Sequence, residues 1–447
     1  MTRVVTRIPP SPTGRLHIGT ARTALFNYLF ARHENGTVVF RSEDTDRARS
    51  KKEFEDEILE GLAWLGLSWD AFSRQSERAA RYRELIEGLV RKGRAYISEE
   101  PSREDPEKTV ELVRLRNPGA RITFIDLVRG GITFDTAELG DFVIARSLDD
   151  PVYHFAVVAD DMDAGVTHVI RGEDHISNTP RQILIQEALG APRPAYAHLP
   201  LILDKKRAKL SKRSPSGVPQ IADLRAEGFM PEALVNYLAL LGWNPGDARE
   251  DFSLAELVEA FTLGGVQKSG AVWDRTKLLS VNQRWMRTLP PDEFIERGGL
   301  GALGFAPEPL AKAVPLLQER ARTFAEAHAL AGGELLCLFE APAPDAAALR
   351  AKEAPGLPRA DAALAQFLAS VERLPDGSSA DAARAALMPL AEAAEAEGKG
   401  GRGAVLWPLR YALSGQERSP DPFTLVSLIG PAEAARRLKK AIGILGG

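Results

Sequence analysis

VVTRIPPSPTGRLHIGTARTALFNYLFARHENGTVVFR, residues 4–41, decides the fold of this 447-residue chain. A β-branched segment at 4–8 is followed by a Pro/Gly loop, by an amphipathic run from about Ala21 to His33, and by a second β-branched segment at 37–41. A strand, a helix and a strand in this order predict a βαβ unit, and therefore a parallel sheet that is covered by helices.

The composition of the chain changes near residue 290. Before this point further strands are expected at 121–125, 132–134, 142–145, 167–171 and 199–203. After it the chain is rich in Ala, Leu and Glu with apolar residues at helical spacing, and helices are expected at 307–340, 360–373 and 380–397. The predicted fold class is α/β, a Rossmann-like doubly wound parallel sheet, followed by an all-α C-terminal region.

Bulk properties narrow the class of protein. The chain is 44% hydrophobic and 26% charged, as folded proteins are, and its length suggests about three domains. The single cysteine, Cys337, excludes a disulfide framework. No secretory signal pattern and no apolar run of about 18 residues is present, so a cytoplasmic protein without a membrane partner is expected. A net charge of −4 neither supports nor excludes nucleic-acid binding.

The loop and helix start within RLHIGT (15–20) carry the first chemical signal. Gly14 and Gly19 remove side chains where a ligand could approach the backbone. His17 and Thr20 lie at the first turn of the helix, whose free N–H groups favour phosphate. An imidazole and a hydroxyl there could hydrogen-bond an anion whose charge grows during a reaction. Taken alone, the motif is as consistent with an ordinary turn as with a phosphate-binding site.

A basic loop, DKKRAKLSKR at 204–213, is the second signal. Lys209 and Lys212 flank Ser211, and two lysines at this spacing can close on a polyphosphate. A charged loop after a strand is usually only solvated. A phosphate-binding helix start followed about 190 residues later by a second basic loop is less often accidental, so the pair predicts a nucleotide site.

The two signals together resemble a known family. RLHIGT is similar to the HIGH signature, and KLSKR to the KMSKS signature, of class I aminoacyl-tRNA synthetases. The surrounding sequence resembles bacterial-type glutamyl-tRNA synthetases in RIPPSPTGRLHIGTART, RSEDTDRAR (41–49), LGLSWD (65–70), THVIRGEDHISNTPRQ (167–182) and WDRTKLLSVNQ (273–283). GAVLWPLRYALSG (403–415) and FTLVSLIG (423–430) resemble their anticodon-binding module.

The resemblance implies an activity and a domain layout. It implies an enzyme that activates L-glutamate with ATP and Mg²⁺, transfers it to tRNA(Glu), and acts as a monomer. The implied parts are the first half of the catalytic domain at 1–87, an acceptor-stem insertion at 88–150, the second catalytic half at 151–215, a helical stem-contact domain at 216–290 and a helical anticodon-binding region of two subdomains at 291–447.

The resemblance also assigns site residues. The catalytic residues are His17, Thr20, Lys209 and Lys212. ATP is contacted by these four and by Gly14, Gly19, Glu173, Leu210 and Ser211. Glutamate is contacted by Arg7, Ser11, Glu43, Tyr153 and Arg171. The tRNA is contacted by Arg47, Trp273 and Arg410.

The glutamate set has a chemical reason, because a dicarboxylate with one ammonium group needs guanidinium groups and a carboxylate. Arg171 is expected near the side-chain carboxylate, and Glu43 is expected to face the ammonium. Each has an ordinary structural alternative. Arg7 could be a surface arginine and Glu43 could pair with a nearby arginine. Arg171 could form an ion pair with one of the two acidic residues that follow it.

Three features depart from the family pattern. The insertion at about 88–150 is short for the family, which leaves open how the acceptor end is held. The stretch RAYISEEPSRED (94–105), where many relatives carry zinc-binding cysteines, has none, so no zinc is expected. A polar substrate contact found in some relatives appears as Val157 and is not carried over.

Alternative functions remain open at this point. The enzyme could also charge tRNA(Gln) with glutamate, and the residue that decides this should lie at 300–395. A glutaminyl enzyme is disfavoured because the C-terminal half is helical. A small adenylyltransferase would not need this C-terminal region. An inactive RNA-binding paralogue is disfavoured by the intact basic residues.

Overall fold

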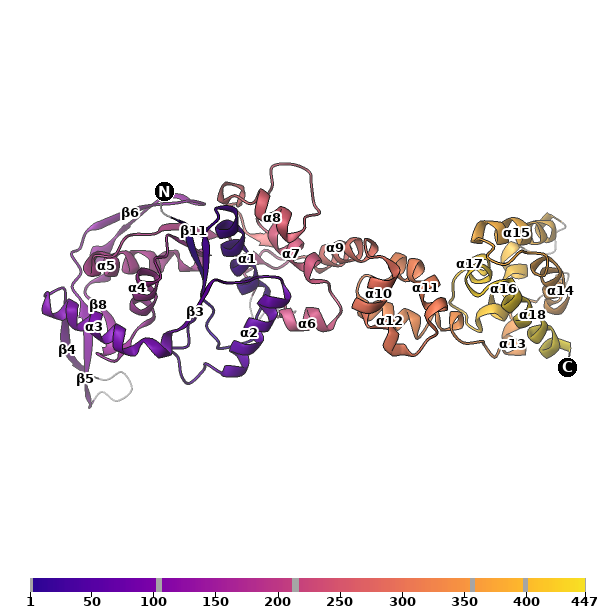
Figure 1. Ribbon diagram of the computed structural model, residues 1–447, viewed down its shortest axis with the longest axis horizontal. Helices are drawn as coiled ribbons and strands as arrows, with labels where there is room; N and C mark the ends of the chain where they lie inside the picture. The colour runs from indigo at the N-terminus through magenta and orange to yellow at the C-terminus, as the bar shows by residue number, and fades with distance from the viewer. Residues whose placement is uncertain (1–2, 102–106, 211–216, 354–357, 397–400, 447) are drawn as a thin grey trace. The chain divides into compact units, whose positions relative to one another are not determined.

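The computed structural model describes residues 3–101, 107–210, 217–353, 358–396 and 401–446 (Figure 1). The chain forms two compact units, Met1–Val281 and Asn282–Gly447. Within the described residues every strand belongs to the first unit, and the second is built of helices. The predicted α/β fold with an all-α C-terminal region is therefore confirmed.

Parallel strands form the centre of the first unit. They are β1 (Val5–Ile8), β2 (Thr37–Ser42), β3 (Ala71–Arg74), β10 (His168–Gly172) and β11 (Ala195–Leu199). β2 pairs in parallel with both β1 and β3, and β10 pairs in parallel with β11. β1 and β10 lie side by side, because the Thr167 amide donates to the Val5 carbonyl at 3.0 Å and the Val5 amide donates to Thr167 Oγ1 at 2.9 Å.

The resulting strand order is β3-β2-β1-β10-β11, so the chain proceeds in opposite directions from the junction between β1 and β10. In open α/β sheets ligands bind in the crevice at such a point, beyond the carboxyl ends of the strands. The fold therefore places the loop after β1 and the residues that end β10 at the expected position of a ligand.

Helix α1 (Ile18–His33) leads directly out of that loop. It is hydrophobic on most sides, and Leu25, Phe26 and Leu29 are fully or almost fully buried. Buried Asn27 ties it to the sheet by donating from Nδ2 to the Ile170 carbonyl at 3.0 Å. The N-terminus of α1 is thus held rigidly beside the end of β10.

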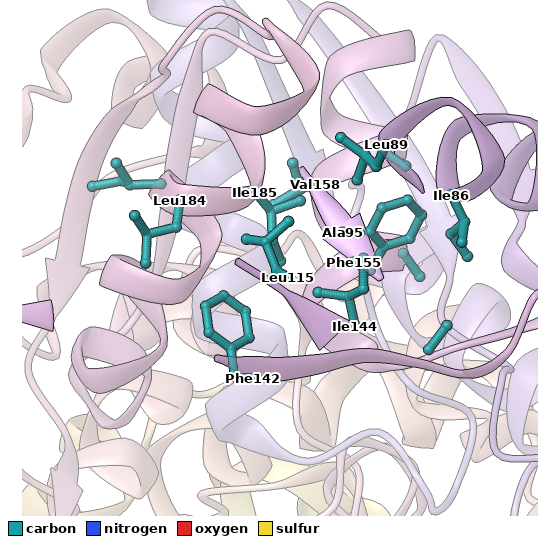
Figure 2. Close-up of a cluster of buried hydrophobic side chains, with 14 of the residues drawn as sticks. Ile86, Leu89, Ala95, Leu115, Phe142, Ile144, Phe155, Val158, Leu184 and Ile185 are labelled. Carbon is teal, nitrogen blue, oxygen red and sulfur yellow. The ribbon is translucent and has the colours of Figure 1, made fainter. Parts of the chain in front are cut away.

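A second, antiparallel sheet is inserted between the two halves of the parallel sheet. Its strands are β4 (Ala95–Pro101), β5 (Thr109–Leu115), β8 (Phe142–Ser147) and β9 (Asp150–Pro151), and a hairpin of β6 (Arg121–Asp126) and β7 (Gly130–Asp135) joins β11. Side chains of α3 (Ala79–Arg91), α4 (Tyr153–Asp163) and α5 (Thr179–Leu189) meet those of this sheet in one apolar cluster (Figure 2). Because Phe155 and Val158 belong to this cluster, the cluster fixes α4 and with it Tyr153.

The strand predicted at 199–203 is wrong as a single element. β11 ends at Leu199, and β12 (Ile202–Leu203) pairs instead with β13 (Ala271–Val272). Pro200 lies between the two strands and has no N–H to donate, so the ladder cannot continue through it. The interruption turns Leu201 toward the cavity described below.

The other helices of the first unit surround this sheet. They are α2 (Lys52–Trp64), α6 (Ile221–Ala226), α7 (Pro231–Leu240), α8 (Leu254–Ala260) and α9 (Arg275–Arg287), the last of which continues into the second unit. None of the described helices is both long enough and apolar enough to span a membrane.

The second unit consists of short helices. They are α10 (Pro291–Gly298), α11 (Pro307–Arg320), α12 (Phe324–Ala331), α13 (Ala346–Leu349), α14 (Ala360–Val371), α15 (Ala380–Ala396), α16 (Arg402–Ser414), α17 (Pro422–Ile429) and α18 (Pro431–Gly446). The helix predicted at 307–340 is interrupted, because Thr323 caps α12 by accepting from the Glu326 amide at 3.2 Å. Buried Arg437 donates to the carbonyls of Cys337 and Leu413 at 2.7 Å each, which joins α18 to two neighbouring segments.

Candidate active site

A cavity of about 560 Å³ lies at the crevice between β1 and β10, and we call it the central cavity. Its wall is formed by the loop after β1, the first turn of α1, the end of β10 and the segment after β11. It brings together most of the predicted ATP and glutamate residues, namely Arg7, Ser11, His17, Gly19, Thr20, Glu43, Tyr153, Arg171, Lys209 and Leu210. Gly14 and Glu173 are described but do not line it.

His17 caps helix α1. Its Nδ1 accepts from the amides of Gly19 at 3.1 Å and Thr20 at 3.2 Å. Because Nδ1 accepts, a neutral ring carries its proton on Nε2, which lies 3.3 Å from Thr20 Oγ1. A Cβ atom at Gly19 would lie 3.1 Å from the imidazole, so a side chain there would press on the ring where it folds back on the helix end. The arrangement presents an imidazole N–H, a hydroxyl and a helix N-terminus, all of which favour a phosphate.

Arg171, in β10, is a buried cation that uses three of its five N–H donors on neutral acceptors. Nε donates to His198 Nε2 at 3.1 Å, Nη1 to Gln182 Oε1 at 2.7 Å and Nη2 to Thr179 Oγ1 at 2.9 Å. One N–H on each terminal nitrogen remains, which is the number that a carboxylate takes in a bidentate pair.

Arg171 has no carboxylate within ion-pairing distance among the residues that the structure describes. The two acidic residues that follow it in sequence pair elsewhere, Glu173 with Arg129 and Asp174 with Lys209. The alternative of an ion pair with either of them is therefore absent. Burial lowers the pKa of the Arg171 guanidinium, as expected for a cation that lacks a counter-ion.

Arg7 and Glu43 belong to a buried network of charges. Arg7 Nε lies 3.4 Å from Asp161 Oδ1, and the same oxygen accepts from Arg41 Nη1 at 2.6 Å. Arg41 Nη2 donates in turn to Glu43 Oε1 at 3.0 Å. Arg7 is only 2% exposed, so it is not a surface arginine. The pair between Glu43 and Arg41 that the sequence left open is present.

Glu43 retains the ability to bind a cation despite that pair. Its Oε2 makes no hydrogen bond to any described residue, and the side chain lines the central cavity. Burial raises the pKa of its carboxyl, although Arg41 and Arg7 oppose this. A ligand ammonium beside Glu43 would complete the neutralisation of the carboxylate.

A second cavity of about 1120 Å³ adjoins the first, and we call it the side cavity. Ser11, Glu43 and Tyr153 line both cavities, and Arg47 lines the side cavity. Tyr153 begins helix α4 and is 36% exposed. A molecule in the side cavity could therefore contact these shared residues, as could one in the central cavity.

The basic loop is described only as far as Leu210. Lys209 Nζ lies 3.0 Å from Asp174 Oδ2, and the Leu210 amide donates to the Ile202 carbonyl at 3.0 Å. Ser211 and Lys212 lie outside the described residues. Glu173 Oε1 accepts from the Leu201 amide at 2.9 Å, so it holds the segment after β11, and its contact with ATP stays a prediction.

The residues predicted to contact tRNA are far apart in the sequence and differ in exposure. Trp273 is 8% exposed and packs edge-on against Tyr237, with ring centroids 5.2 Å apart. In the second unit the Arg410 guanidinium lies over the Trp407 ring, 5.1 Å from its centroid. These positions assign Trp273 a packing role in the first unit and leave its contact with tRNA a prediction.

The structure adds polar residues that the sequence did not identify. Asp161 and Asp160 end the buried part of α4, and Gln182, Thr179 and His198 surround Arg171. The signal for the first two was a pair of aspartates at the end of an apolar helix. The signal for His198 was one polar residue in the apolar strand AYAHL. Among the described residues no group of three or more His, Cys, Asp or Glu could hold a metal ion.

Comparisons with known proteins agree over the whole chain. The family model for "tRNA synthetases class I (E and Q), catalytic domain" matches residues 3–109 and 97–280, and the model for "Anticodon binding domain" matches 283–442. Proteins named glutamate–tRNA ligase are 40% identical to this chain in Synechococcus sp., over 95% of both chains, and in Geobacter sulfurreducens, over the full length of both. A crystal structure of a glutamate tRNA ligase from Elizabethkingia meningosepticum, in complex with its amino acid, has a TM-score of 0.85 at 30% identity and covers 99% of this chain and 100% of that one.

Proposed function

This chain belongs to the bacterial glutamate–tRNA ligases, a family of class I tRNA synthetases, and we propose how its two cavities divide the work of that reaction. The enzyme uses ATP to join L-glutamate to tRNA(Glu). The observation that carries the proposal is the buried Arg171, which lines the central cavity, lacks a carboxylate partner among the described residues and has two N–H groups left to donate.

Glutamate binds at the inner end of the central cavity. The two remaining N–H groups of Arg171 bind the side-chain carboxylate as a bidentate pair. Glu43 binds the ammonium through its available oxygen, and Arg7 supplies positive charge toward the α-carboxylate. Ser11 and Tyr153 donate further hydrogen bonds from the boundary with the side cavity.

ATP binds at the outer end, against the N-terminus of α1. Nε2–H of His17, the Thr20 hydroxyl and the Lys209 ammonium are the donors that the chain offers to the phosphates there. Magnesium bound to ATP would offset phosphate charge there, because this ion commonly keeps its waters and binds substrate phosphates with few protein carboxylates.

The chemistry takes place in two steps without an enzyme nucleophile. An oxygen of the α-carboxylate of glutamate attacks the α-phosphorus of ATP, the bond to the β-phosphate oxygen breaks, and pyrophosphate leaves. The 2′-hydroxyl of the terminal adenosine of the tRNA then attacks the carbonyl carbon of glutamyl-adenylate, and AMP leaves. Catalysis consists of positioning and of charge stabilisation at the phosphates. The side cavity, with Arg47 in its wall, is the proposed place of the terminal adenosine.

Aminoacylation of separately purified tRNA(Glu) and tRNA(Gln) with labelled glutamate and glutamine tests the function. We expect tRNA(Glu) to be charged with glutamate and not with glutamine. Charging of tRNA(Gln) with glutamate in the same assay would identify a non-discriminating enzyme. Failure to charge any tRNA with glutamate would disprove the proposal.

We also propose that the enzyme works as a monomer in the cytoplasm.

Zinc should not be needed for this activity. No thiolate is available in the stretch 94–105, and the only cysteine of the chain, Cys337, is buried in the second unit. We expect the protein purified without added zinc to contain less than stoichiometric amounts by elemental analysis, and its charging rate to be unchanged after treatment with a zinc chelator. Stoichiometric zinc, or a rate that a chelator abolishes and zinc restores, would contradict this prediction.

A further inference from the structure

His198 lies behind Arg171 on β11 and is fully buried. Its Nε2 accepts from Arg171 Nε at 3.1 Å, and its Nδ1 lies 2.6 Å from Asp126 Oδ2. An arginine side chain can only donate, so Nε2 must be unprotonated. A neutral imidazole then carries its proton on Nδ1, directed at Asp126. The state of His198 that suits Arg171 is therefore one tautomer of the neutral ring.

Asp126 is held rigidly enough to select that tautomer. Its carboxylate accepts from the backbone amides of His198 at 3.1 Å, Val128 at 3.0 Å and Arg129 at 2.8 Å. It lies at the end of β6, opposite Tyr196, where β6 pairs with β11. Burial opposes its charge, but His198 and the amides outweigh burial and lower the pKa of the Asp126 carboxyl, so it remains an acceptor. Burial also lowers the pKa of His198, which keeps the ring neutral.

We propose that Asp126 and His198 are positioning residues for glutamate recognition: Asp126 fixes the tautomer of His198, and His198 holds the Arg171 guanidinium with its two remaining N–H groups directed at the side-chain carboxylate. This inference rests on the proposed function, because it needs glutamate in the central cavity. It adds two residues that do not touch the substrate and act on it only through Arg171. The arrangement resembles in principle a buried aspartate that orients a catalytic histidine.

A purely structural role makes different predictions. If the Asp126–His198 pair served only to join β6 to β11, its loss would lower stability and would reduce activity with all substrates alike. If it positions Arg171, its loss should raise the KM for glutamate and leave kcat and the KM for ATP nearly unchanged, because His17, Thr20 and Lys209 keep their places. The split between these constants distinguishes the two roles.

The experiment measures aminoacylation of tRNA(Glu) by the full-length enzyme, by four single variants and by the double variant Asp126→Asn/His198→Gln, with melting temperature recorded for each. Asp126→Asn presents an amide that can donate to Nδ1, which permits the wrong tautomer and sets Nε2–H against Arg171 Nε–H. His198→Leu removes the acceptor, whereas His198→Gln can place an amide oxygen near Nε2. Tyr196→Phe is the matched control, since it removes another buried hydrogen bond of the same strand, to Gln186, and keeps the ring beside Arg171.

We expect Asp126→Asn and His198→Leu each to raise the KM for glutamate about tenfold, as loss of a hydrogen bond to a charged group does. His198→Gln should stay within about threefold of the wild type, and adding Asp126→Asn to it should cost little more, because a side-chain amide has no tautomer to select. Tyr196→Phe should leave the KM for glutamate unchanged.

Three results would overturn the proposal. The first is an unchanged KM for glutamate in a folded Asp126→Asn protein. The second is an equal effect of Asp126→Asn in the wild-type and His198→Gln backgrounds. The third is an equal KM for glutamate in His198→Leu and His198→Gln, and this comparison decides if Asp126→Asn does not fold. The wild-type enzyme is measured in the same series. If the proposed function is wrong, no protein, including the wild type, will charge tRNA(Glu); if only this inference is wrong, the wild type will still do so.

Discussion

Replacing Arg171 with alanine should lower kcat/KM for glutamate about 30-fold or more. This corresponds to a loss of about 2–5 kcal/mol of interaction with the substrate. The reason is the isolation of this cation. Its three protein partners are neutral, so the ligand carboxylate is the only anion that the proposed complex supplies to it. Steady-state charging of tRNA(Glu) at varied glutamate concentration measures the loss. Because the wild-type protein already buries Arg171 without a counter-ion, the melting temperature should change little or rise.

Arg171→Gln sharpens this test. A neutral amide can pair with either glutamate or glutamine, so the preference for glutamate should narrow as glutamate binding falls. The matched control is Arg193→Ala, because this exposed arginine lies just before β11 and, of the residues that the structure describes, pairs only with Glu187 and the Thr123 carbonyl. The control should leave both kinetic constants unchanged. A glutamate-to-glutamine ratio that stays the same in Arg171→Gln would show that this residue does not set specificity.

Replacing His17 should slow adenylate formation by a factor of about 10²–10³, because a preorganised donor at the developing phosphate charge is lost. The side chain has two roles that can be separated. Nδ1 caps α1, and Nε2, which lies 3.3 Å from Thr20 Oγ1, is the proposed donor to phosphate. Asparagine can reproduce the cap at the position of Nδ1, whereas glutamine can place an amide N–H near Nε2. We therefore expect His17→Asn to be stable and slow, and His17→Gln to recover part of the rate.

ATP–pyrophosphate exchange with tRNA present measures this step, and thermal melting measures the cap. Ser253→Ala is the matched control, since it removes the capping box of α8 at a position that does not line the central cavity. It should lower stability by about 0.5–2 kcal/mol and leave the exchange rate unchanged. If His17→Asn exchanges as fast as the wild type, the imidazole serves the helix alone.

The sequence predicted the parts of the fold that depend on local patterns. The β1–α1–β2 unit follows from β-branched segments on either side of a helix-forming run, and it fixes the parallel sheet. The run was predicted to be amphipathic, but α1 is hydrophobic on most sides because it is buried. The apolar run around Pro200 predicts a single strand, but in a central strand a residue without an N–H cannot donate to the ladder. β4 and β5 were not predicted, although β4 alternates buried or half-buried residues with exposed ones, because charged residues there obscured the period of two.

The sequence predicted many of the residues that the structure brings to the central cavity, and their roles toward ligands stay predictions. Arg7, His17 and Arg171 are recognisable because they lie near the end of a strand or at the start of a helix within distinctive motifs. Their buried partners are not, because contacts such as Arg7 with Asp161 or His198 with Asp126 join positions that are 154 and 72 residues apart. No local pattern reports such a pair. Only the packing of α4 and β6 against the parallel sheet brings the partners together.

The attachment of β6 has a consequence for protein engineering. The stretch 88–150 looks like a cassette that could be exchanged between relatives to alter how a tRNA end is held, yet β6 ends at Asp126 and is followed by Arg129, which pairs with Glu173. A chimaera cut at the sequence boundaries would therefore import a foreign support for the proposed glutamate site. A chimaera should therefore keep residues 121–129 of the enzyme that receives the exchanged stretch. Chimaeras that also exchange these residues should still accept tRNA but should discriminate poorly among amino acids.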